Sequence, residues 1–438
     1  MDANSRQHDS PTFFTKRVFQ QDQAMAQARA AYFKIYIRGV IMVAITILSI
    51  FSIFWGALWR IPAYALPGWI DFDGGELGQI VAQDLMAADM SVVSWEMVPA
   101  SEFPNGIDGV AEKIRDNRAW VAVIINQGAT ARLESSISNP NASYKGEEAI
   151  TVYGIEARNE RAYRELILPT ISHLMASVKL DVATRYATKL STNSASNVTS
   201  ILAISPQTIV NPVSYTLINL VPFSQPVAAA AISTGLIFVL IMSFFVVNIA
   251  NGAREASKMN KLLKFRSLIA LRLGSSFISY FFLSLIYSLL NLAFKLDLAH
   301  VYGHAGFMVF WMFSWTYMLA VGLALESLIT LLKQYLQYFL ILWIVVNISV
   351  VLFPLEVLPK VFHYGYAAPF YNVAEAVRTI VFGTKNSLGL NFGVLIAWVL
   401  ISCLSLIGIQ WFVRWQDAKL ILEAEKKARE APGEKQGA

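Results

Sequence analysis

The sequence predicts a polytopic α-helical membrane protein with six transmembrane helices and a folded α/β (α+β) domain inserted between the first two of them. Of its 438 residues, 55% are hydrophobic and only 15% are charged, whereas about 25% of the residues in an average soluble domain are charged. Its charge-free stretches are also long enough to cross a bilayer, which takes about 20 residues of helix. A chain with so little charge needs lipid around part of its surface.

Six charge-poor stretches predict six membrane-spanning helices. A cytoplasmic segment, residues 1–38, precedes the first of them. A cleaved signal peptide is the rival interpretation of the first stretch, which is too long and begins too far into the chain for one. The soluble domain takes residues 60–226, an outer loop residues 356–387, and a cytoplasmic tail residues 414–438. The predicted spans are residues 39–59, 227–250, 273–294, 305–325, 335–355 and 388–413.

The distribution of Lys and Arg predicts the orientation of these spans. Nineteen basic residues fall on the side of the two chain ends, against four in the short loops on the other side. Because basic residues are retained in the cytoplasm, we expect both termini there and residues 60–226 outside it, in the plasma membrane or another secretory-pathway membrane. In that region the sequons at Asn141 and Asn197 are glycosylation candidates.

The segment between the first two spans alternates short apolar runs with helical patterns, which indicates strands separated by helices. About 165 residues are enough to bury a core of their own. A long helical pattern follows from 160 to 190, with a kink expected at Pro169. Strands are expected at residues 68–73, 91–98, 119–126 and 150–156.

Glu326 is the most informative single residue. It follows 28 residues that contain no Asp, Glu, Lys or Arg, so it lies either within the fourth helix or at its cytoplasmic end near Lys333. An ionisable group in hydrocarbon costs at least about 2.5 kcal/mol and marks a substrate path or a proton relay. Asn248, Asn291 and Asn347 are further transport candidates, and their alternative role is hydrogen bonding between helices. The sequon that begins at Asn347 falls within a predicted span and is attributed to chance.

Two clusters raise the question of a metal site. Asp71, Asp73 and Glu76 surround two glycines, but the run lacks the EF-hand pattern, and a turn that closes a strand is the simpler interpretation. His300 and His304 are four residues apart, but no third ligand is evident. We expect no metal, no cofactor and no catalytic residue.

Six segments carry a likeness to a known family: residues 69–75 (WIDFDGG), 119–125 (AWVAVII), 219–223 (NLVPF), 364–372 (YGYAAPFYN), 378–385 (RTIVFGTK) and 388–393 (LGLNFG). They resemble the fungal DUF3533 family of membrane proteins, which includes nitrosoguanidine-resistance proteins. The likeness covers roughly residues 35–415. More distantly, the layout of one span, a large outer domain and five further spans resembles type-2 ABC exporter permeases and their phage-infection-protein relatives.

The resemblance implies a role in the efflux of toxic compounds or in resistance to them, but it does not fix a substrate. A lipid or a drug is the expected cargo. The resemblance also implies re-entrant or interfacial helices in residues 356–387 and a homodimer. The chain has no G-x-x-x-x-G-K-[ST] motif, so such a permease needs a separate ATPase, a proton gradient acting through Glu326, or a downhill substrate gradient. The alternative is a non-transporting regulator or sensor that alters lipid distribution or another transporter. An enzyme ranks third, since no nucleophile, base and orienting group gather in one stretch, and no nucleic-acid partner is expected.

Overall fold

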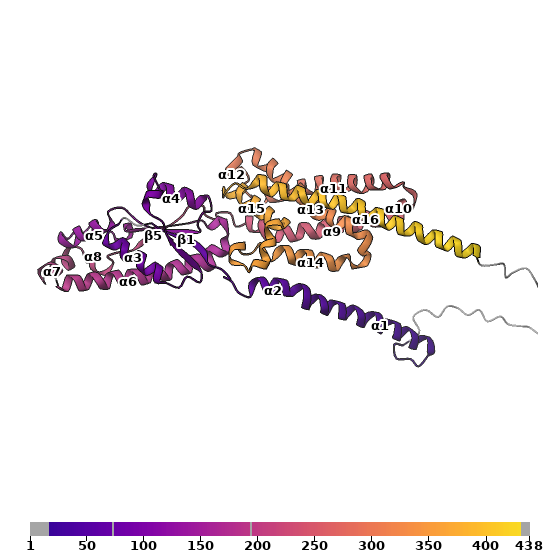
Figure 1. Ribbon diagram of the computed structural model, residues 1–438, viewed down its shortest axis with the longest axis horizontal. Helices are drawn as coiled ribbons and strands as arrows, with labels where there is room; N and C mark the ends of the chain where they lie inside the picture. The colour runs from indigo at the N-terminus through magenta and orange to yellow at the C-terminus, as the bar shows by residue number, and fades with distance from the viewer. Residues whose placement is uncertain (1–16, 72–73, 193–194, 431–438) are drawn as a thin grey trace, which may run out of the picture. The chain divides into compact units, whose positions relative to one another are not determined.

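The computed structural model describes residues 17–71, 74–192 and 195–430 (Figure 1). The described chain is mostly helical and contains one five-stranded sheet. It divides after Ile53 into two compact units. In the first unit, α1 (Gln23–Thr46) begins where the side chain of Asp22 accepts a hydrogen bond from the Ala24 backbone N–H. A π-helical turn (Ile47–Phe51) then leads into α2 (Ser52–Leu58).

The sheet has the strand order β2-β1-β3-β4-β5. β1 pairs in parallel with β2 and β3, β4 runs antiparallel to β3, and β5 is parallel to β4. All five residues of β3 and of β4 are buried, as expected for central strands made of continuous apolar runs. The bounds are β1 Leu66–Asp71, β2 Val93–Met97, β3 Val121–Ile125, β4 Ile150–Gly154 and β5 Tyr215–Asn219.

In the described residues, six α-helices accompany this sheet to form an α/β domain. One core cluster joins α4 to the sheet through apolar side chains such as Ile114, Ile124 and Tyr153. Pro169 is the second residue of α6, and a π-helical turn (Ala162–Ile167) precedes it, so the kink predicted there is a change of helix type. The helices are α3 Glu76–Ala87, α4 Gly106–Arg115, α5 Ala129–Ser138, α6 Leu168–Thr192, α7 Ala195–Ile204 and α8 Gln207–Val210.

A bundle of long helices follows the domain. α13 is its central helix, and it packs against α9, α11, α14, α15 and α16. A π-helical turn (Ala230–Thr234) precedes α9, and a 3-10 turn (Lys333–Tyr335) joins α13 to α14. The elements are α9 Gly235–Ala256, α10 Met259–Leu262, α11 Phe265–Ala293, α12 Ala299–Tyr302, α13 Ala305–Leu332, α14 Leu336–Ile348, α15 Pro369–Phe382 and α16 Leu388–Glu430.

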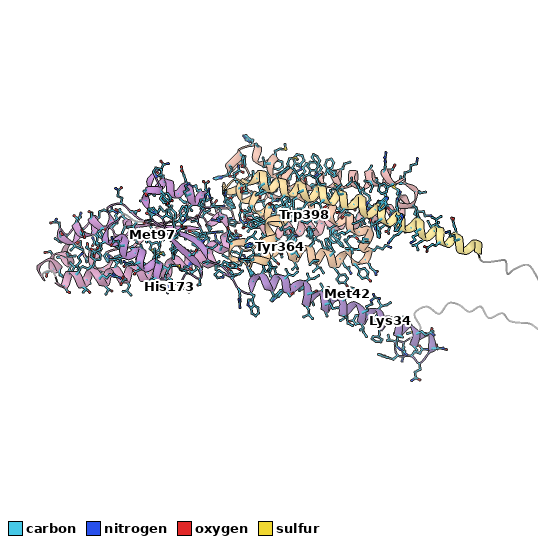
Figure 2. All side chains as sticks on the ribbon, in the orientation of Figure 1. Lys34, Met42, Met97, His173, Tyr364 and Trp398 are labelled. Carbon is cyan, nitrogen blue, oxygen red and sulfur yellow. The ribbon has the colours of Figure 1, made fainter. Side chains whose placement is uncertain are left out.

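The segment predicted as an outer loop is folded into the bundle. It contains 3-10 turns (Leu355–Val357 and Lys360–Ala367) and then the largely buried α15. Tyr364 and Trp398, both labelled in Figure 2, fix this segment. Tyr364 donates a 2.8 Å hydrogen bond to the Val346 carbonyl of α14, and Trp398 of α16 donates one of 2.7 Å to the Ala367 carbonyl.

Connections of the long helices give the bundle two distinct ends. α10 joins α9 to α11, and the turn after α13 lies at the same end. α12 joins α11 to α13 at the opposite end, where it packs against α15. In Figure 1 the α/β domain adjoins the end with α12 and α15. These are called below the α10 end and the domain end.

Six helical stretches in the described chain are long and apolar enough to cross a membrane. They are not one-to-one with the six predicted spans. Ala305–Ile348 contains the whole predicted fourth span, in α13, but only residues 335–348 of the predicted fifth span, which follow the 3-10 turn in α14. Ala162–Ser191 lies in the α/β domain, where α6 packs against α3, α7 and α8. The others are Gln23–Leu58, Ala230–Ala256, Phe265–Ala293 and Leu388–Lys426.

Candidate functional site

Glu326 lies inside the bundle, on the central helix α13. Its side chain is 1% exposed, and α13 continues for six residues beyond it. The sequence allowed Glu326 to lie either within the fourth helix or at its end near Lys333. The structure has it within the helix. A carboxylate withdrawn from solvent among apolar helices needs compensating charge or hydrogen-bond donors, because its desolvation is costly.

Two arginines supply that compensation. Arg272 Nε lies 2.6 Å and Arg254 Nη2 lies 2.8 Å from the same oxygen, Glu326 Oε1, and the arginine side chains are 2% and 6% exposed. Arg254 comes from the last turn of α9, and Arg272 lies seven residues into α11. The Arg254–Glu326–Arg272 cluster thus ties three helices together around one carboxylate and carries a net positive charge.

Neutral groups complete the surroundings of Arg272. Its Nη1 donates to Thr330 Oγ1 at 2.9 Å and to Gln410 Oε1 at 2.5 Å, and its Nη2 donates to the Glu326 carbonyl. Gln410 brings in a fourth helix, α16. Glu326 Oε2, by contrast, is buried with no hydrogen-bond partner among the described residues. One carboxylate oxygen therefore carries both ion pairs, and the other retains its capacity to accept.

A cavity of about 580 Å³ reaches this cluster from the α10 end. Arg254, Arg272, Thr330 and Gln410 line it, so the buried charges form part of its wall. A volume of several hundred Å³ with a few polar groups is typical of a small-molecule site. The cavity is called below the basic cavity.

The arginines of this cluster were missed as site residues because each had been taken as the boundary of a span. α11 begins at Phe265, however, which leaves Arg272 about 10 Å inside the helix. Glu326 lies at a similar depth from the end of the antiparallel neighbour α13. Opposite charges at matching depth in two consecutive apolar helices were the signal that could have identified the pair.

The three asparagine candidates do not gather at one place. Asn248 is exposed and lines the basic cavity, while its side chain donates to the Phe244 carbonyl at 2.8 Å. Asn291 is buried and donates to the Tyr287 carbonyl at 2.9 Å. Asn347 is fully buried; it donates to Trp343 of its own helix and accepts from the Phe370 backbone N–H at 3.2 Å, so it joins α14 to α15.

The remaining candidates lie in the α/β domain or at helix ends. Asn141 is exposed, and its side-chain oxygen accepts from both the backbone and the hydroxyl of Ser143. The side chains of Asn197 and Asp71, and all of Asp73, lie outside the described residues. Glu76 pairs with Lys189 of α6 at 2.8 Å, and His300 and His304 are exposed at the two ends of the α12 connection. In the described part of the chain, no three His, Cys, Asp or Glu residues come together as a metal site requires.

Ion pairs connect the α/β domain to the segment before α16. Arg158 stacks on the Trp120 ring, 3.6 Å from its centroid, and its Nη2 lies 3.1 Å from Glu356 Oε1. The largely buried Arg378 of α15 binds Glu375 at 2.9 Å and Glu160 at 3.4 Å. Guanidinium groups held this way by an aromatic ring and carboxylates fix the relative position of the two surfaces.

Glu156 fixes the junction between β5 and the bundle. It accepts from the Phe223 backbone N–H at 3.0 Å, from Asn219 at 3.0 Å and from Arg164 at 2.6 Å. Burial alone would raise the pKa of Glu156, but these hydrogen bonds outweigh it and hold the pKa below its usual range. The Phe223 ring packs 4.7 Å from that of Phe382, which extends the connection to α15.

Comparison with known proteins identifies the family. Residues 39–404 match the model of a protein family of unknown function, DUF3533. The chain is also 28% identical over 298 residues to an uncharacterized endoplasmic reticulum membrane protein of Saccharomyces cerevisiae. That match covers 66% of this chain and 58% of the yeast protein. No solved structure matches the chain significantly. The chain therefore belongs to the DUF3533 family and is a multi-pass membrane protein.

Proposed function

We propose that this protein moves an amphipathic substrate, a lipid or a toxic compound, across a secretory-pathway membrane, and that the Arg254–Glu326–Arg272 cluster is the polar centre of the path. The observation that carries the proposal is a charged cluster inside an apolar bundle, in the wall of an open cavity. Ionisable residues at such depth are costly and are found on substrate and ion paths. Efflux of this kind would confer resistance to toxic compounds.

The proposed orientation puts the α10 end in the cytoplasm and the α/β domain on the opposite, luminal or extracellular side. Basic residues gather at the α10 end, among them Lys258, Lys261 and Lys264, as the positive-inside bias requires. The exposed sequon at Asn141 suits the compartment in which glycans are added. The yeast relative named above is an endoplasmic reticulum protein, which favours that membrane as the site of action.

A non-transporting regulator is the second candidate, and the contacts of Arg158 and Arg378 favour it. They connect the α/β domain to α15 and to the 3-10 turn Leu355–Val357. A ligand or partner bound by the domain could therefore bias the bundle through those ion pairs. In that case the partner is another transporter or a lipid-organising protein. The proposed transporter instead needs a separate ATPase, a proton gradient acting through Glu326 or a downhill gradient, and a homodimer is proposed for it as well.

Flux through purified protein separates the two candidates. The full-length chain is reconstituted in liposomes that contain a fluorescent phospholipid, and its movement between leaflets is followed by chemical quenching, with and without a pH gradient. Transport predicts protein-dependent movement that falls at least tenfold in Gln410→Met, which removes a neutral partner of Arg272, and stays unchanged in Lys264→Gln. The same comparison with a fluorescent amphipathic drug covers the other cargo class. No movement of either probe by the wild type, with or without the gradient, would favour the regulator.

A further inference from the structure

The basic cavity has the chemistry of a phosphate site. Among the described residues, five basic side chains line it, and only Glu255 and Asp417 oppose them. Two of the five, Arg254 and Arg272, share the single buried carboxylate of Glu326. The other three are Lys261, Lys333 and Arg414. We propose that this cavity binds a phosphate group, carried by the headgroup of an anionic phospholipid or by a soluble phosphate compound.

Arg414 is held in place for such contact. Its Nη2 donates to the backbone carbonyls of Leu263 at 2.8 Å and Asn260 at 3.2 Å, which anchors the α10 connection on α16. Within the described residues, no carboxylate lies within ion-pair distance of it. An arginine that is positioned by backbone carbonyls but not neutralised keeps its full charge for an anion, and guanidinium groups bind phosphate oxygens in a bidentate manner.

Two lysines complete the rim. Lys261 lies in α10, and Lys333 begins the turn after α13; both are exposed. Lys333 has a backbone φ of 48°, in the region that favours glycine. A non-glycine residue in that region costs about 1–3 kcal/mol, and such strain is concentrated at functional sites.

The surroundings of the rim fit a lipid as the carrier of the phosphate. In α10, Met259 and Leu262 are 41% and 76% exposed beside Lys261. Exposed apolar side chains next to lysines are characteristic of segments at the boundary between acyl chains and headgroups. A volume of about 580 Å³ also lies in the usual range for small-molecule sites. Phosphate binding here goes beyond the proposed transport, because it requires no movement of substrate.

Binding to the full-length protein in neutral detergent tests the proposal. The protein is titrated with phosphatidic acid, with phosphatidylcholine and with inorganic phosphate, and bound ligand is measured by native mass spectrometry, or by scintillation proximity for the phosphate. Lys261→Gln combined with Lys333→Gln removes two rim charges without touching the buried cluster. Lys264→Gln combined with Arg266→Gln is the matched control, because both are exposed at the same end but line no part of the cavity.

Each basic residue near an anionic group strengthens binding about fivefold. The cavity variant should therefore raise the Kd for phosphatidic acid about 30-fold, and the control variant should raise it less than about threefold.

The ligand preference identifies the source of the phosphate group. Preference for phosphatidic acid over both other ligands assigns the lipid headgroup, and equally tight binding of inorganic phosphate assigns a soluble phosphate compound; both results support the site. Equal affinity for phosphatidic acid and phosphatidylcholine without phosphate binding, or equal losses in the two variants, would overturn it. Since no gradient or flux is involved, this result is independent of the transport assay.

Discussion

Replacement of Glu326 by Gln tests the buried cluster most sharply. The change keeps the shape of the side chain but removes the negative charge that two arginine side chains share at 2.6 and 2.8 Å. Both guanidinium groups are then left almost without solvent or counter-charge, since their side chains are only 2% and 6% exposed. Removing one partner of a buried ion pair costs about 3–5 kcal/mol. Gln keeps one acceptor oxygen, so we expect a loss near 3 kcal/mol, or about 10²-fold in the unfolding equilibrium.

Unfolding of the purified protein in mixed micelles, followed by circular dichroism as a denaturing detergent is added, measures this loss. The matched control is Glu255→Gln, an exposed acidic residue at the same end of α9 that should shift stability by less than about 0.5 kcal/mol. The double variant Arg254→Gln with Glu326→Gln should recover part of the loss, because it removes one of the uncompensated charges. If Glu326→Gln and Glu255→Gln unfold at the same concentration of denaturing detergent, the Glu326 carboxylate does not stabilise the bundle and the reasoning is wrong.

Three further predictions concern packing, pH dependence and glycosylation. In Gly322→Ala the new Cβ would clash with the buried ring of Tyr280, so we expect a loss of about 1–3 kcal/mol in the same unfolding assay. Gly408→Ala meets nothing within 4 Å and should cause no loss. Because the folded protein holds the pKa of Glu156 below its ordinary value of 4.5, its ionised form stabilises the fold above that pH, and this stability disappears as the pH falls through the folded-state pKa. Glu156→Gln should therefore lower the Tm more at pH 7 than at pH 3. Asn141→Gln should remove one glycan, seen as faster gel migration that endoglycosidase treatment of the wild type reproduces; unchanged migration would contradict the proposed orientation.

Local sequence patterns predicted the strands whose residues share one kind of environment along their length. Apolar runs bounded by turn residues identified the four strands β1 to β4, and the wholly buried β3 and β4 show why their sequences are continuously apolar. β5 was missed. Three of its five residues are exposed, so its apolar pattern is weak, and it forms the edge of the sheet next to β4. An edge strand is specified largely by its neighbour, which lies far away in the sequence.

Tertiary contacts decided what the sequence left open. The position of Glu326 within the helix was one of two alternatives, and its partners Arg254 and Arg272 were not identified because they lie on other helices. A rule based on uncharged stretches ends a helix at the first arginine, although a helix continues wherever its charges find partners. The basic cavity was equally hidden, since its lining comes from α9, α10, α11, α13 and α16. Only the packing of these helices around α13 brings those side chains together.

Labelling of single cysteines in sealed microsomes tests most directly the central claim, that the basic cavity and the α/β domain lie on opposite sides of the membrane. Cys403 is first replaced by Ala, and Ser257→Cys at the α10 end or Ser138→Cys in the α/β domain is then introduced at an exposed position. With a membrane-impermeant maleimide, the account predicts that Ser257→Cys reacts in intact vesicles and that Ser138→Cys reacts only after detergent is added. Equal labelling of both cysteines in intact vesicles would contradict it.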